Sequence, residues 1–202
     1  MKKINEYRDY IKNRENPVIF DKNGEFVYFP VNKVMQTTIA RNLLSKRCIV
    51  YKDNPKLWLE YFEKTDFDNI YKFGIIRNPA DKFESAFNYL KKNPRLSKRL
   101  KINNLNINDF VKTKIIKYDN PYNFNSHFEK QYEGFFYNNN ILVDDLIKLE
   151  NINDINNLFN KLEIENNEIF NKTEHLSVLT DESIEIIKKI YINDYKFLYK
   201  NN

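Results

Sequence analysis

The chain has 202 residues, of which 33 are Lys or Arg, 28 are Asp or Glu, and 42% are hydrophobic. This length can bury a core without disulfides, so we expect one globular domain over residues 1–202, with its core at about residues 25–200. Three dispersed glycines, one cysteine and two histidines exclude Gly-rich nucleotide loops, Cys-rich zinc sites and an internal disulfide.

Residues 1–16 contain no apolar run of the kind that a signal peptide needs. No later stretch approaches the ~20 apolar residues of a membrane span. The single thiol, Cys48, fits a reducing compartment. These features predict a cytoplasmic protein without a membrane span.

Alternating strand and helix patterns follow one another along the chain. Strands are predicted at residues 25–31, at 71–77, and at 141–143 continuing into 146–149, with a buried strand start at Cys48. Helices are predicted at residues 37–45, 79–90, 152–162 and 180–199, and the asparagine-rich residues 103–108 and 138–140 are predicted loops. This order predicts a single α/β domain with a central parallel sheet flanked by helices.

A candidate anion site follows the strand at residues 25–31. Lys33 lies in the turn, and Thr37 and Thr38 begin the next helix. The first amides of a helix lack backbone acceptors and bind anions, while the hydroxyl groups and the lysine add further donors. The pattern is that of a phosphate-binding loop without its glycines. It also fits an ordinary turn with a threonine cap and a surface lysine.

A second candidate begins at Arg77, at the carboxyl end of the strand at residues 71–77. Ser85 follows eight positions later on the next helix. A guanidinium binds phosphate through two parallel hydrogen bonds, and a hydroxyl can reach the same anion. In the alternative interpretation, Arg77 pairs with Asp81 or Glu84, and Ser85 lies inside the helix.

Together the two segments resemble the sulfotransferase superfamily, especially the carbohydrate sulfotransferases that use 3′-phosphoadenosine 5′-phosphosulfate (PAPS). Residues 32–38, Asn-Lys-Val-Met-Gln-Thr-Thr, stand where family members have a loop like P-K-T-A-G-T-S, and residues 77–87 match R-D-P-x-x-R-x-x-S-A-Y. The resemblance implies a P-loop-like sulfotransferase fold. It implies that Arg77 and Ser85 bind the 3′-phosphate, and that the 5′-phosphosulfate is held by Lys33, Val34, Met35, Gln36, Thr37 and Thr38.

Weaker similarities extend the resemblance over about residues 26–199. Residues 126–131 are similar to the family's H-[FW]-x-P-Q segment, and residues 149–151 to its F-E-N/D strand end. Residues 171–175 are similar to N-K-[ST]-x-H, and Tyr191, Asp194 and Tyr195 to Y-x-x-D-[FY]. The resemblance implies that Lys172 closes over the cofactor.

The family reaction needs a cation at the leaving group and a base for the acceptor hydroxyl. Lys33 is the expected cation, and His127 is the expected base because an imidazole titrates near neutral pH. The alternative bases are Glu60, His175 and Glu129. The expected acceptor is a saccharide or another hydroxyl-bearing molecule. No metal cofactor is expected.

Two other functions compete with this hypothesis. A P-loop-like kinase shares the sheet and the anion loop, although the sequence lacks the G-K-[ST] that positions its metal. A basic nucleic-acid-binding module would use the basic residues between 91 and 101 together with the formal net charge of +5. We expect no nucleic-acid partner. A hydrolase based on Cys48 is disfavoured by the predicted burial of that residue.

Overall fold

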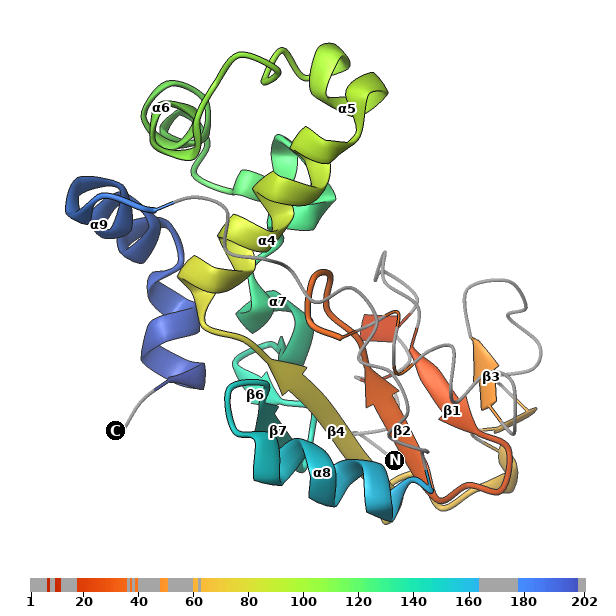
Figure 1. Ribbon diagram of the computed structural model, residues 1–202. Coiled ribbons are helices and arrows are strands. Elements are labelled where there is room, and N and C mark those ends of the chain that lie inside the picture. The colour runs from red at the N-terminus through yellow and green to blue at the C-terminus, as the bar shows by residue number, and fades with distance from the viewer. Residues whose placement is uncertain are drawn as a thin grey trace. The chain divides into compact units, whose positions relative to one another are not determined.

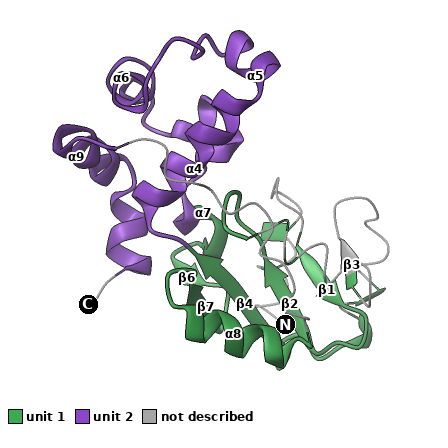
Figure 2. Cartoon of the chain, viewed as in Figure 1, with its two compact units in different colours: residues 1–76, 133–171 green, residues 77–132, 172–202 purple. Residues whose placement is uncertain are grey.

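The computed structural model describes residues 7, 10–11, 18–35, 37, 39, 48–50, 60–61, 63–163 and 178–199. The chain divides into two compact units, residues 1–76 with 133–171 and residues 77–132 with 172–202, coloured green and purple in Figure 2. A compact unit need not fold independently, so a single domain over residues 1–202 stays a prediction. Each unit is described separately.

The first unit contains, within its described part, a five-stranded sheet of order β3-β1-β2-β4-β7 (Figure 1). The strands are β1 (Ile19–Asp21), β2 (Phe26–Phe29), β3 (Cys48–Val50), β4 (Tyr71–Ile76) and β7 (Asp145–Lys148). The pairs β2–β4 and β4–β7 are parallel, whereas β1 is antiparallel to both β2 and β3. The fold is therefore α/β as predicted, but the sheet is mixed, and the prediction of a parallel sheet was wrong for its β3–β1–β2 side.

A tight turn between β1 and β2 makes this pair antiparallel. One carboxylate oxygen of Asp21 accepts the N–H groups of Asn23 and Glu25, both at 3.1 Å. Gly24 closes the turn with a left-handed φ of 77°. This short connection returns the chain beside β1, and a parallel pair would need a much longer crossover.

The strand predicted over residues 141–149 is two separate elements. Ile141 belongs to β6 (Asn140–Ile141), which pairs with β5 (Phe136–Tyr137) across a turn. Asn138 and Asn139 have left-handed φ angles of 48° and 63°, and asparagine tolerates this region well. The prediction of a loop at residues 138–140 therefore holds only for the first two of them.

The core of the first unit forms on both faces of β4. The rings of Tyr28 and Phe73 stack at 5.0 Å, and Phe135 packs so closely on Gly74 that any Cβ there would overlap its ring. The helix α8 (Ile152–Lys161) contacts β7 and buries Ile155, Leu158 and Phe159. Its cap is Asn151, whose side chain accepts the N–H groups of Asn153 and Asp154.

The second unit is helical within its described part. Its helices are α4 (Pro79–Lys92), α5 (Pro94–Arg99), α6 (Ile107–Thr113), α9 (Asp181–Ile190) and the short turns η2 (Ile115–Lys117), η3 (Pro121–Asn123) and η4 (Ser126–Phe128). They enclose an aromatic core with Phe83, Phe87, Phe110, Phe128 and Tyr191. The helix α7 (Gln131–Phe135) lies where the chain returns to the first unit. No described helix has both the length and the apolar surface to cross a membrane.

Asparagine caps start most of these helices. Asn78, Asn93 and Asn106 each accept a backbone N–H from the first turn of α4, α5 and α6. The prediction of a loop at residues 103–108 was therefore wrong at its end, because Asn106 begins a helix instead of extending the loop.

The predicted helix at residues 180–199 is interrupted. Thr180 caps α9, which ends before Tyr191, and residues Asp194–Leu198 form a π-helix, η5. Three hydrogen bonds from two side chains accompany the break. The Tyr191 hydroxyl donates to the carbonyl of Phe128 at 2.7 Å, and the fully buried Asp194 accepts bonds from the start of α7.

Candidate functional site

The loop after β2 has an unusual backbone. Lys33 and Met35 have left-handed φ angles of 65° and 49°, whereas Val34 between them does not. The fully buried Val34 anchors the loop, and the N–H of Ile39 donates to the carbonyl of Met35 at 3.0 Å, as in a helix. Anion-binding nests use left-handed residues to turn successive amides to one side, and the positive φ angles of Lys33 and Met35 are of this kind.

The predicted loop residues differ in exposure. Lys33 and Met35 are half-buried, and Thr37 is exposed and helical. Gln36 and Thr38 lie outside the described residues, as does most of the helix predicted at residues 37–45. Of the predicted group, the structure therefore assigns Lys33, Thr37 and the backbone around Val34 to a compact turn that can offer positive charge and N–H donors.

Arg77 directly follows β4 and is held by its backbone. Its N–H donates to Oε1 of Gln131 at 2.8 Å, and its carbonyl accepts from Nε2 of the same side chain at 2.7 Å. The Gln131 side chain is fully buried, so it cannot exchange these bonds for water. The side-chain amide of Gln131 therefore fixes both backbone polar groups of Arg77, the N–H and the carbonyl.

Gln131, whose side chain bonds to Arg77, is itself held by a residue from the C-terminal part of the chain. The Asp194 carboxylate accepts the N–H of Gln131 at 3.0 Å and that of Tyr132 at 2.8 Å. Burial raises the pKa of Asp194, while these two hydrogen bonds and the charge of Lys82 oppose the shift. Three segments distant in the sequence thus form one connected network around Arg77.

Lys82 is a buried cation that the sequence analysis did not single out. Its side chain is 1% exposed, and its Nζ donates to the carbonyl of Glu129 at 2.7 Å and to that of His127 at 3.4 Å. Burial lowers the pKa of Lys82, and the charges of Glu129 and Asp194 oppose this effect. Lys82 therefore holds the segment that carries the predicted base.

His127 is half-buried on η4. Its ring stacks on that of Tyr89 with centroids 4.7 Å apart and an interplanar angle of 20°, and its Nδ1 lies 2.8 Å from Oδ1 of Asn125. Among the alternative bases, Glu129 is half-buried near Lys82, and Glu60 is exposed beside Lys64 at 3.9 Å. His175 and Lys172 lie outside the described residues.

One face of α4 is both buried and polar. Glu84, Ser85 and Asn88 are only 5%, 3% and 6% exposed, and their spacing places them on the same side of the helix. Nδ2 of Asn88 has no hydrogen-bond partner within the described part of the chain. Buried polar groups of this kind are informative, because a helix packed only as core would carry apolar residues there.

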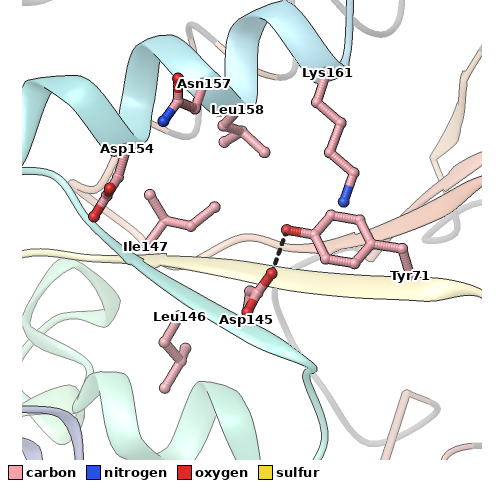
Figure 3. A pocket seen from close by; sticks show the side chains of 8 residues that line it. All are labelled: Tyr71, Asp145, Leu146, Ile147, Asp154, Asn157, Leu158 and Lys161. Atoms are coloured by element: carbon pink, nitrogen blue, oxygen red, sulfur yellow. Dashed lines mark hydrogen bonds between the residues drawn. The ribbon is translucent and has the colours of Figure 1, made fainter.

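A cavity of about 350 Å³ lies in the first unit between α8 and the first residues of β4 and β7 (Figure 3). The Tyr71 hydroxyl donates to Asp145 at 2.9 Å, and Nζ of Lys161 lies 3.2 Å from the Tyr71 ring centroid. Burial, then the hydrogen bond to Asp145, raises the pKa of Tyr71. Lys33 follows the opposite, carboxyl end of the parallel strands, and none of the predicted site residues that the structure describes lines this cavity.

The predicted residues are distributed over both units. Lys33, Val34, Met35 and Thr37 belong to the first, and the second contains Arg77, Ser85 and His127. No group of three or more His, Cys, Asp or Glu side chains suited to a metal ion occurs among the residues described. No family model, no curated protein and no solved structure matches this chain.

Proposed function

We propose that this protein is a PAPS-dependent sulfotransferase, which transfers a sulfuryl group to a hydroxyl of a carbohydrate acceptor and releases adenosine 3′,5′-bisphosphate. The observation that carries the proposal is the hydrogen-bonded series from Arg77 through Gln131 to Asp194. These three residues come from three separate motifs that resemble the family. The series joins the three motifs at the main chain of Arg77, the residue that the resemblance assigns to the 3′-phosphate.

The proposal assigns the 5′-phosphosulfate to the loop after β2. Lys33 neutralises the charge that develops on the leaving oxygen, and the amides around Val34, with Thr37 and Thr38, donate hydrogen bonds. The left-handed φ angles of Lys33 and Met35 support this role, because they suit an anion nest. Removing one such donor typically costs ~3–4 kcal/mol, so Lys33→Ala should lower the transfer rate at least about a hundredfold.

The 3′-phosphate is assigned to Arg77 and Ser85. The guanidinium supplies two parallel hydrogen bonds, and the backbone clamp by Gln131 reduces the freedom that binding would have to remove. The buried polar face of α4 supports Ser85 as a ligand, and the unpartnered Nδ2 of Asn88 offers a further donor on that face.

His127 is assigned to the acceptor hydroxyl. Its imidazole takes the hydroxyl proton while the acceptor oxygen forms the new bond to sulfur. The bond from sulfur to the 5′-phosphate oxygen breaks, and the bisphosphate leaves with the electron pair. The chain's own contribution is mainly positioning and charge stabilisation, as in phosphoryl transfer.

Thermal unfolding with adenosine 3′,5′-bisphosphate, AMP and ATP tests the assignment of the nucleotide. A ligand at about a hundred times its Kd stabilises by ~2.7 kcal/mol, which raises the Tm of a chain of this size by roughly 5–10 °C. We expect the bisphosphate to raise the Tm more than AMP does. Arg77→Ala should abolish that difference. Arg95→Ala is the matched control, because it removes an exposed arginine of the same unit.

Other outcomes would support the competing functions. Stabilisation by ATP with Mg²⁺ but not by the bisphosphate would indicate a kinase. Strongly salt-dependent binding of DNA or RNA that is insensitive to Arg77→Ala would indicate the nucleic-acid module. In a transfer assay, His127→Ala should abolish activity while leaving bisphosphate binding intact. An active His127→Ala variant would move the role of base to another residue.

A further inference from the structure

Two side chains fix the orientation of the His127 imidazole. The Tyr89 ring, stacked at 4.7 Å and 20°, sets the plane of the imidazole. The contact from Nδ1 to Oδ1 of Asn125, at 2.8 Å, then sets its rotation within that plane. Together they leave Nε2 on the side of the ring opposite Asn125.

The Asn125 atom that faces Nδ1 is identified by a second contact. The backbone N–H of His127 donates to the same Oδ1 at 3.0 Å, because Asn125 is the cap of η4. If the amide were reversed, its NH₂ group would face this N–H, and two donors would oppose each other. The oxygen therefore faces both the backbone N–H and Nδ1 of His127. An amide oxygen can accept a hydrogen bond only from a nitrogen that carries hydrogen, so Nδ1 is protonated.

We propose that Asn125 is a positioning residue that holds neutral His127 as the Nδ1–H tautomer, with the lone pair on Nε2. The inference rests on the proposed function for its consequence: Nε2 is the atom that takes the acceptor's proton, and Nδ1 keeps its own. Free histidine prefers the opposite tautomer, Nε2–H, which presents no lone pair at that position. The contact with Asn125 thus prepares the ring for proton abstraction.

An asparagine that only caps a helix would not affect the tautomer of His127. Asn120 caps the short helix η3 in the same unit, accepting the N–H of Tyr122 at 3.1 Å, and the residue at this position is a tyrosine instead of a histidine. Asn120→Ala therefore measures the effect of losing such a cap. Asn125→Ala loses the cap and the acceptor for Nδ1, whereas Asn125→Asp retains an oxygen for both.

Nitrogen-15 NMR of the histidine rings tests the tautomer directly in the full chain. The protein has two histidines, so comparison with His127→Gln assigns the signals. At about pH 8.5 imidazole is neutral. A ring nitrogen that carries hydrogen and one that does not then have clearly separate nitrogen-15 chemical shifts. We expect Nδ1 protonated and Nε2 unprotonated in the wild type and in Asn125→Asp, and a shift toward Nε2–H in Asn125→Ala. Asn120→Ala should leave the wild-type pattern.

An Nε2–H signal in the wild type, or an unchanged tautomer in Asn125→Ala, would overturn the inference. If Asn125→Ala does not fold, the wild-type spectrum alone decides. In the transfer assay, Asn125→Ala should lower kcat about tenfold or more, with Asn125→Asp recovering most of it and bisphosphate binding unchanged in both. Failure of the proposed function would look different. In that case the bisphosphate would not bind, although the Nδ1–H tautomer would still be observed.

Discussion

Replacing Gln131 tests whether one buried amide holds the end of β4. Gln131→Met preserves the length of the side chain and removes both bonds to Arg77, at 2.8 and 2.7 Å. Each buried polar group left unpartnered costs about 1–3 kcal/mol, and because Arg77 is half-buried we expect about 2–4 kcal/mol in total. With an m-value of about 2 kcal/mol/M, the urea midpoint should fall by about 1–2 M.

Two further variants sharpen this test. Gln131→Glu can accept the N–H of Arg77 but cannot donate to its carbonyl while ionised, and its charge lies near Asp194. Its pKa in the folded state should therefore be raised, so its stability should fall as the pH rises toward neutrality. Lys130→Met is the neighbouring control, because among the described residues its amine makes one exposed bond, to the carbonyl of Asp119. Equal urea midpoints for Gln131→Met and Lys130→Met would refute the reasoning.

Two other predictions concern packing and pH. Gly74→Ala should destabilise the protein by about 1–3 kcal/mol because its Cβ would overlap the Phe135 ring, and Phe135→Leu should recover part of that loss in the double mutant; purely additive unfolding free energies would contradict the contact. Burial lowers the pKa of Lys82 in the folded protein, whereas in the unfolded chain the same amine titrates near ~10.4. At pH values between these two pKa values the unfolded state therefore binds more protons than the folded state. The free energy of unfolding should therefore gain a component that rises with pH across this window and is lost in Lys82→Met. Urea unfolding at successive pH values measures it, and identical slopes for the two proteins would exclude it.

Elements with strong local sequence patterns were predictable. The run ending at Ile76, followed by Asn78 and Pro79, indicated a strand and a helix start, and the structure has β4 and α4 there. The apolar spacing after Asn151 likewise predicted α8. Cys48 lies in a strand and is buried, as expected. In each case the sequence pattern that indicates the element lies within a few residues.

The failures depend on contacts between distant residues. Nothing local indicated that residues 180–199 would break near Tyr191, because the buried Asp194 is bonded to residues 131 and 132. The antiparallel β1 depends on the turn at Asp21, and its three residues are too few to show a strand pattern in the sequence. Asn125 could have been found as a helix cap, since asparagine precedes a short turn there, but its contact with Nδ1 of His127 required coordinates.

If the loop after β2 binds the phosphosulfate as proposed, glycine is not essential to such a site. Met35 stands where the resembling family has a small residue, and its left-handed backbone costs about 1–2 kcal/mol, as does that of Lys33. Each charge-assisted hydrogen bond contributes about 1.5–3 kcal/mol, so a phosphosulfate bound by two amides and the Lys33 ammonium would gain more than this strain costs. The strain is also present before the ligand binds, and the buried Val34 anchors the turn. Binding therefore need not supply the energy to form the loop, and the Cβ atoms at these positions lower the stability of the free protein rather than its affinity for the anion.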